Sequence, residues 1–205
     1  MKSLHFSIDL AAASALMVLA CGAASAQPPT NGARVSPTST TGGARSAAAA
    51  GQVDRDATQA FVKQAGQANR AEIEEAKYVM DHTQSQSVKD FAQKMISDHT
   101  MALDQLKQIA STGGYEVPNN VDAKDKASME KLKLKTGARM NMAYSSDQEK
   151  DHRAVISKFE EAAQNHQIAP AVREYARTTL PTLKEHLRMA QQLVASESQG
   201  NRKTG

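Results

Sequence analysis

The chain has 205 residues and a formal net charge of +3, and its 25 basic and 22 acidic residues contain no basic run dense enough to indicate nucleic-acid binding. Tryptophan is absent, aromatic residues make up 4% and Cys21 is the only cysteine, so a β-rich fold and a disulfide scaffold are excluded. The length suits one domain, and the abundance of good helix formers predicts an all-α class.

The N-terminal segment has the layout of a secretory signal peptide, predicted over residues 1–26. Lys2 precedes the apolar run LAAASALMVLA and the small-residue stretch CGAASAQPP. The apolar run is shorter than the roughly 20 residues that span a bilayer. We therefore expect export to the periplasm, with cleavage after Ala26 and no transmembrane segment in the mature chain. The alternative is a lipobox, VLAC, which would make the protein an outer-membrane lipoprotein tethered through a lipidated Cys21.

Residues 27–54 follow as a segment rich in Pro, Gly, Ser, Thr and Ala, with almost no large apolar side chains. Such a composition cannot bury enough surface to order itself and is typical of a disordered linker. Apolar residues then recur at helical spacing. They predict a helical domain over residues 55–196, followed by a disordered tail over residues 197–205.

Within this domain the periodicity predicts long helices joined by turns. The first runs from about 55 to 82 and the second from about 85 to 111, where TGGYEVP ends it. The third lies within 122–166, with a break near Gly137. The fourth begins near Pro170 and reaches about 195, with a bend at Pro181. Because the connections are short, we expect a ferritin-like, antiparallel four-helix bundle with up-down-up-down order.

Three histidines each follow an acidic residue and fall in line with the apolar residues of their predicted helices. They are His99, His152 and His186. In an up-down-up-down bundle each lies about 14 to 16 residues from the same end, which places all three roughly 21 to 24 Å along the axis. We therefore expect them to share one layer of the core, with Glu72 of the first helix at the same level.

One interpretation of this layer is a metal site. Inward-facing imidazole and carboxylate ligands hold metal ions in ferritin-like proteins, so Glu72 and the three histidines would hold one transition metal ion, iron, zinc or copper. Further candidate ligands are Glu149, in a Glu-x-x-His motif with His152, and the soft donors Met95 and Met189. The Glu-x-x-His motif occurs once, whereas a di-iron oxidase would need it on two helices.

The other interpretation is structural. A buried neutral histidine that hydrogen-bonds to an acid on a neighbouring helix fixes the register of the helices without binding a ligand. Asp98, Asp151 and Glu185 precede the three histidines and point toward neighbouring helices. The sequence does not indicate a conventional enzyme, because no serine is placed for nucleophilic catalysis and Cys21 belongs to the leader.

Several segments together resemble the bacterial exported proteins of domain-of-unknown-function family 4142. They span about residues 59–194 and include FVKQAGQANRAEIEEAKYVMDH, QSVKDFAQKMISDHTMALDQLKQIA, YSSDQEKDHRAVISKFEEAA and LPTLKEHLRMAQQL. The resemblance implies a ferritin-like bundle in the bacterial envelope and places emphasis on Glu72 and the three histidines. It implies no reaction. The sequence departs from the family at RMNMAY, where a Phe-Asp pair is common, so any role of that acid falls to Asn141.

The sequence therefore predicts an exported envelope protein with a non-catalytic binding, structural or stress-related role and a buried histidine layer. The alternative is a metal-binding protein or metal-dependent oxidoreductase that uses the inward-facing His and Glu residues. No protein partner is identifiable from these residues.

Overall fold

The structure, a computed structural model, describes residues 53–203, and its regular structure over that range is entirely α-helical. The described helices are α1 (Arg55–His82), α2 (Gln86–Gly113), α3 (Ala123–Lys133), α4 (Gly137–Gln164) and α5 (Pro170–Lys203). The predicted signal peptide, the Cys21 lipobox and nearly all of the predicted linker lie outside the described residues. None of the described helices is both long and apolar enough to cross a membrane.

The helix ends have local causes that the sequence contains. The Asp54 carboxylate caps α1 by accepting hydrogen bonds from the first-turn amides of Asp56 and Ala57. Gly114 ends α2 in the left-handed conformation, with a φ of 68°. The predicted break in the third helix separates α3 from α4, and Gly137 begins α4 with a φ of 54°.

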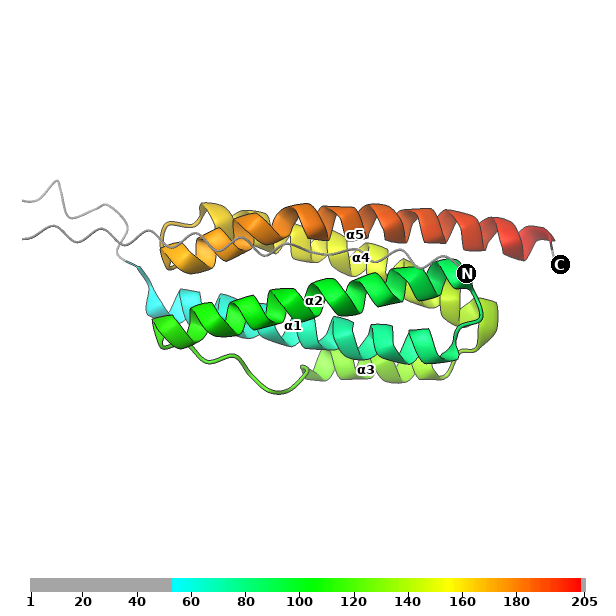
Figure 1. Cartoon of the computed structure of the whole chain (residues 1–205), viewed down its shortest axis with the longest axis horizontal. Helices are drawn as coiled ribbons and strands as arrows, with labels where there is room; N and C mark the ends of the chain where they lie inside the picture. The colour runs from blue at the N-terminus through cyan, green and yellow to red at the C-terminus, as the bar shows by residue number, and fades with distance from the viewer. Residues whose placement is uncertain (1–52, 204–205) are drawn as a thin grey trace, which may run out of the picture. The chain divides into compact units, whose positions relative to one another are not determined.

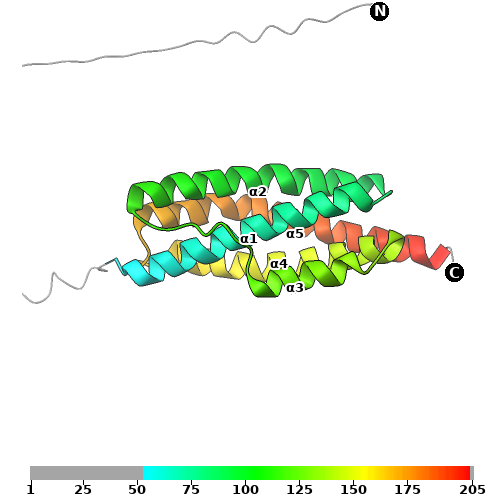
Figure 2. The ribbon, with the colours of Figure 1, turned by 90° about the horizontal axis from the view of Figure 1, so that it is seen from below.

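The order of the helices in space differs from the predicted up-down-up-down order. The loop after α2 and α3 itself cross from one end of the helical domain to the other, so α4 runs in the same direction as α2 (Figure 1 and Figure 2). Contacts at the ends agree: Thr83, between α1 and α2, donates to Asn141 near the start of α4 at 2.7 Å. The Asp54 amide, at the start of α1, donates to the Gln167 carbonyl in the α4–α5 turn at 2.7 Å. The prediction was wrong because residues 114–136 form a long crossover and not a short connection.

The C-terminal end also differs from the sequence prediction. Residues 197–205 are predicted to be disordered, whereas α5 continues to Lys203. Glu197 accepts a 3.3 Å hydrogen bond from the Ser85 hydroxyl, which lies just before α2. A polar composition therefore does not end this helix, and Glu197 near its end contacts the residue that precedes α2.

The apolar core is divided into two clusters by a buried polar layer. The first core lies toward the start of α1 and includes Val62, Leu106, Phe159, Tyr175 and Leu183. The second core lies toward the end of α1 and includes Val79, Phe91, Met95, Tyr144 and Leu193. Between them, on all four long helices, lie the buried polar residues Asn69, His99, Gln148, His152 and His186. Apolar side chains thus close the polar layer at both ends.

Candidate metal centre

The three predicted histidines meet inside the polar layer, which confirms that they share one level of the core. His99 exposes 6% of its surface, His152 exposes 2% and His186 exposes none. The ring centroids of His99 and His152 lie 5.8 Å apart. The centroid of His186 lies 5.2 Å from that of His99 and 5.3 Å from that of His152. One ring nitrogen from each residue lies within 4.8 Å of those of the other two.

The histidines meet although the directions of α4 and α5 were predicted wrongly. α4 has 28 residues and α5 has 34, and His152 and His186 lie close to their midpoints. A residue at the midpoint of a helix stays at the same level whichever way the helix runs. The predicted layer is therefore right, while the connectivity used to reach it is not.

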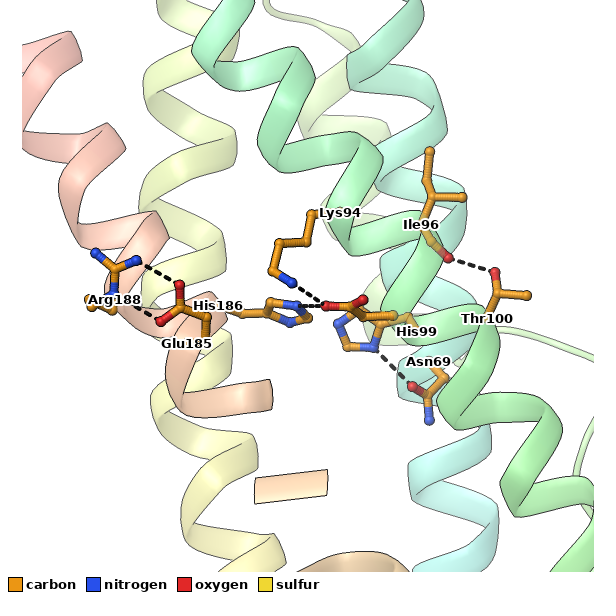
Figure 3. A network of polar contacts seen from close by, with 9 residues as sticks. Asn69, Lys94, Ile96, His99, Thr100, Glu185, His186 and Arg188 are labelled. Carbon is orange, nitrogen blue, oxygen red and sulfur yellow. Dashed lines mark hydrogen bonds and ion pairs between the residues drawn. The ribbon is translucent and has the colours of Figure 1, made fainter. Parts of the chain in front are cut away.

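Asn69 of α1 fixes one nitrogen of His99 (Figure 3). Its Oδ1 atom lies 2.9 Å from His99 Nδ1. The other end of the same amide, Nδ2, donates to the Ala65 carbonyl at 2.8 Å and to the Tyr175 hydroxyl at 3.2 Å. Since Nδ2 already has two acceptors, the oxygen of the amide faces the ring. His99 Nδ1 therefore carries a hydrogen and donates it to Asn69.

Acceptors fix one nitrogen of the other two rings in the same way. His152 Nδ1 donates to the main-chain carbonyl of Gln148 at 3.0 Å, and His186 Nε2 donates to the Asp98 carboxylate at 2.8 Å. Lys94 forms an ion pair with the same carboxylate oxygen at 3.0 Å (Figure 3). Both rings are thus held in a single tautomer by groups that can only accept a hydrogen bond.

The remaining nitrogen of each neutral ring carries no hydrogen and therefore has a free lone pair. These atoms are Nε2 of His99, Nε2 of His152 and Nδ1 of His186, and each is buried without a hydrogen-bond partner among the described residues. An unpaired buried polar atom costs about 1–3 kcal/mol, and native proteins contain few of them. Three such atoms in one layer form a set of imidazole donors that suits a transition metal ion.

Burial keeps these rings neutral. Burial, with a smaller contribution from the His186 ring, lowers the pKa of His152 to about 4. Burial and the two neighbouring rings hold the pKa of His99 well below its ordinary value. Burial also lowers the pKa of His186, and the hydrogen bond to Asp98 offsets that effect only in part. Near pH 7 all three imidazoles are therefore in the state that binds metal.

The other predicted ligands lie outside the group of three rings. Glu72 lies one helical turn beyond Asn69 and accepts a 2.6 Å hydrogen bond from the side chain of Gln148. Glu149 forms a 2.7 Å ion pair with Arg153 on its own helix. The predicted soft donors lie one turn from a histidine in each case. Met95 is part of the second core, and Met189 packs against it.

Of the acids that precede the histidines, only Asp98 reaches a ring on another helix. Asp151 lines a cavity beside α3, and Glu185 pairs with Arg188, as Figure 3 shows. Asn141, at the departure from the family pattern, is buried and accepts the hydrogen bond from Thr83. The sequence analysis did not identify Asn69 and Gln148 as partners of the rings. The available signal was that both are amide residues at core-facing positions of their helices.

A pair of carboxylic acids adjoins the polar layer. The side-chain Nε2 of Gln148 donates to Glu72 at 2.6 Å and to Glu75 at 3.0 Å. Burial, and then the negative charge of Glu75, raise the pKa of Glu72 well above its ordinary value. Burial, together with Asp147 and Asp151, raises the pKa of Glu75 to about 7. The negative charge of this pair is thus not balanced by a neighbouring positive charge within the described range.

A comparison with protein families gives one match. The family model described as a domain of unknown function, DUF4142, covers residues 42–193. No curated protein and no solved structure matches the chain. The matched range contains the histidine layer and all of its hydrogen-bond partners, in agreement with the resemblance of the EKDH and LPTLKEH segments. The candidate site therefore lies within the family's own domain, and the chain belongs to the DUF4142 family.

Proposed function

We propose that this protein is an exported metal-binding protein in which His99, His152 and His186 hold one transition metal ion. The observation that carries the proposal is the state of the six ring nitrogens. Three of these nitrogens donate to fixed acceptors. The other three are buried, carry no hydrogen and have no hydrogen-bond partner among residues 53–203. A layer that only set the register of the helices would leave fewer buried nitrogens unpaired.

The ligand set favours zinc or copper over a di-iron centre. Imidazole nitrogen is a borderline donor that suits Zn²⁺ and copper, whereas di-iron sites in ferritin-like proteins are rich in carboxylates. Tetrahedral Zn²⁺ with bonds of about 2.0–2.1 Å places its ligand nitrogens roughly 3.4 Å apart. Because one nitrogen of each ring lies within 4.8 Å of one nitrogen of the other two, a small inward movement of the side chains would close the site around an ion.

The burial of the site supports a binding role and not catalysis. The three rings expose at most 6% of their surface, and the two apolar cores close the layer on both sides. The protein would therefore retain or sense a metal ion, or use it for stability.

The fold and the location belong to the same proposal. We infer that the four long helices form a ferritin-like four-helix bundle, because such bundles contain one long crossover, as the loop and α3 provide here. We also infer export to the periplasm, with cleavage after Ala26. A lipidated Cys21 would instead tether the domain to the outer membrane, and mass spectrometry of the mature N-terminus distinguishes the two.

Metal titration of the untagged, chelator-treated protein tests the histidine centre. Co²⁺ or Zn²⁺ should bind with a stoichiometry of one per chain, and Co²⁺ should give the visible absorption of a nitrogen-ligated site. H99A and H186A each remove a direct ligand, so the loss of affinity should exceed the about 10- to 100-fold typical of an outer partner. H166A, which changes an exposed histidine in the α4–α5 turn, is the control. Equal affinity in H99A, H186A and the parent would show that the layer is structural.

A further inference from the structure

A cavity of about 550 Å³ lies between α1, α3 and α4. Its walls include the acidic side chains of Glu72, Glu74 and Glu75 on α1 and of Asp151 on α4. Further acids come from α3 and the residue before it. The four lysines that line the same cavity are all exposed, so their ammonium groups are available to solvent; they are Lys124, Lys126, Lys133 and Lys158.

At the α1 wall of this cavity two carboxylates share one neutral donor. Glu72 and Glu75 lie one turn apart on α1, and the NH₂ group of Gln148 donates to both, at 2.6 Å and 3.0 Å. Neither carboxylate forms an ion pair with a lysine or arginine among residues 53–203. The amide NH₂ thus occupies the place between the two carboxylates where a cation would compensate their charge.

The same amide holds a buried oxygen without a partner. Gln148 is fully buried, and its Oε1 accepts no hydrogen bond within the described part of the chain. Since both atoms belong to one amide, Oε1 lies about 2.3 Å from the Nε2 that touches the two carboxylates. The hydroxyl of Tyr144, one turn earlier on α4, is also buried and unpaired. Two buried oxygens without hydrogen-bond partners in the described structure, one on Gln148 and one on Tyr144, therefore lie within one turn of each other on α4.

We propose that Glu72, Glu75 and Gln148 form a second metal site, for a hard divalent cation such as Mn²⁺, Ca²⁺ or Mg²⁺. Rotating the Gln148 amide by half a turn directs Oε1 instead of Nε2 at the two carboxylates and gives three oxygen ligands. Water in the adjoining cavity would supply the remaining ligands. Oxygen ligands select hard cations, whereas the three imidazoles select softer ones, so the two sites would take different metals.

The second site goes beyond the proposed histidine centre and does not depend on it. Glu72 was predicted from sequence as a fourth ligand beside the histidines. The structure instead pairs it with Glu75, at the cavity wall, through an amide of α4. A cation here would join α1 to α4 directly.

The experiment uses Mn²⁺ as the probe ion, after the histidine centre of the untagged chain has been filled with Zn²⁺. Paramagnetic resonance of free Mn²⁺ and calorimetry then report one Mn²⁺ site, with a dissociation constant of about 10⁻⁵ to 10⁻³ M, the range of weaker oxygen-ligand sites. E72Q/E75Q keeps the shape of both side chains and should raise that constant at least about tenfold. E74Q is the matched control, because Glu74 lines the same cavity from the same helix but is exposed; its Mn²⁺ affinity should equal the parent's.

Each outcome decides the proposal. If the Zn²⁺-filled parent binds no Mn²⁺, or if E72Q/E75Q binds Mn²⁺ as tightly as the parent, the second site is absent. Mn²⁺ binding that disappears once Zn²⁺ is present belongs to the histidines and overturns the proposal as well. The Co²⁺ absorption of E72Q/E75Q reports the histidine centre separately, so failure of one site is distinct from failure of the other. If the double variant does not fold, E75Q alone and the titration of the parent give the answer.

Discussion

Asp98 is the residue that brings negative charge to the histidine layer. It accepts hydrogen bonds from His186 and Lys94. Burial acts to raise the pKa of Asp98, but these hydrogen bonds outweigh it and hold the pKa below its ordinary value. The group is therefore an ionised carboxylate behind an imidazole, an arrangement that fixes the tautomer and makes the inner nitrogen a stronger donor.

We predict that D98N weakens Zn²⁺ binding by about 10- to 100-fold while the fold is retained. The amide can still accept from His186, but it loses the charge that strengthens the ligand. Competition with a chromophoric chelator measures the affinity. D104N is the control, since Asp104 is an exposed acid on the same helix and pairs, within the described part of the chain, with Lys107. An unchanged affinity in D98N would separate Asp98 from metal binding.

The lowered pKa values of the histidines predict how stability depends on pH. In the unfolded chain a histidine titrates near about 6.5, whereas in the fold the pKa of His152 is about 4 and that of His99 is also lowered. The unfolded state therefore binds more protons, and the free energy of unfolding of the metal-free protein should fall as pH decreases from about 6.5 toward 4. Urea unfolding of the parent and of H99Q/H152Q/H186Q measures the effect; parallel pH curves for the two proteins would contradict it.

The effect of the Glu72–Glu75 pair on the pH dependence of stability has the opposite sign. Burial and neighbouring acids raise the pKa of Glu75 to about 7, so the fold favours the protonated acid. Its contribution to stability is full below about 4.5, the region where the unfolded acid titrates, and is lost as pH rises toward 7. In H99Q/H152Q/H186Q the histidine layer no longer opposes this slope, and we expect the stability of that variant to increase as pH falls from 7 to 5. A further E75Q substitution should flatten that slope.

Among the elements, α3 is the one that the sequence describes least well and that decides the direction of α4. Its single buried residue is Leu132, which packs in the second core with 1% of its surface exposed, whereas Leu134, just after the helix, is 86% exposed. We predict that L132A lowers the free energy of unfolding by about 2–5 kcal/mol. L134A should stay within about 0.5 kcal/mol of the parent. Equal effects in urea unfolding would mean that α3 is not packed against the core.

Helix positions followed from sequence because their signals are local. Asp54, Gly114 and Gly137 act on the chain within one or two turns, so the bounds of α1 and α2 and the break before α4 were predictable. The direction of α4 was not, because it depends on whether residues 114–136 turn back at once or cross the domain. That choice is made by long-range packing, such as the burial of Leu132, and no local pattern encodes it.

The candidate site, too, was predictable from sequence only where its signals are local. The periodicity of the apolar residues was enough to bring three histidines to one level. It could not show that Asn69, and not Glu72, faces His99, because both lie on the inner side of α1 within one turn. The tautomers of His99 and His186 depend on hydrogen bonds between helices, which no spacing within one helix encodes.

On the scale of the whole domain, the histidine layer joins two helical hairpins. His99 belongs to the α1–α2 hairpin, and His152 and His186 belong to the α4–α5 hairpin. An ion held by all three binds the folded state alone, so at 100 times its dissociation constant it should add about 2.7 kcal/mol to the free energy of unfolding. Thermal melts with and without Zn²⁺ should show this gain in the parent and lose it in H99A. A gain that persists in H99A would place the ion elsewhere.

The two apolar cores that close the polar layer have a consequence for the lifetime of a bound ion. Because the ligands are buried and divided between two hairpins, an ion would leave most readily when the hairpins part locally, a motion that is slow compared with diffusion. Its residence time would then be governed by breathing of the protein and not by the strength of the bonds to nitrogen alone. Such kinetics suit long retention of a scarce or toxic metal, and they are poorly suited to rapid hand-over to a partner.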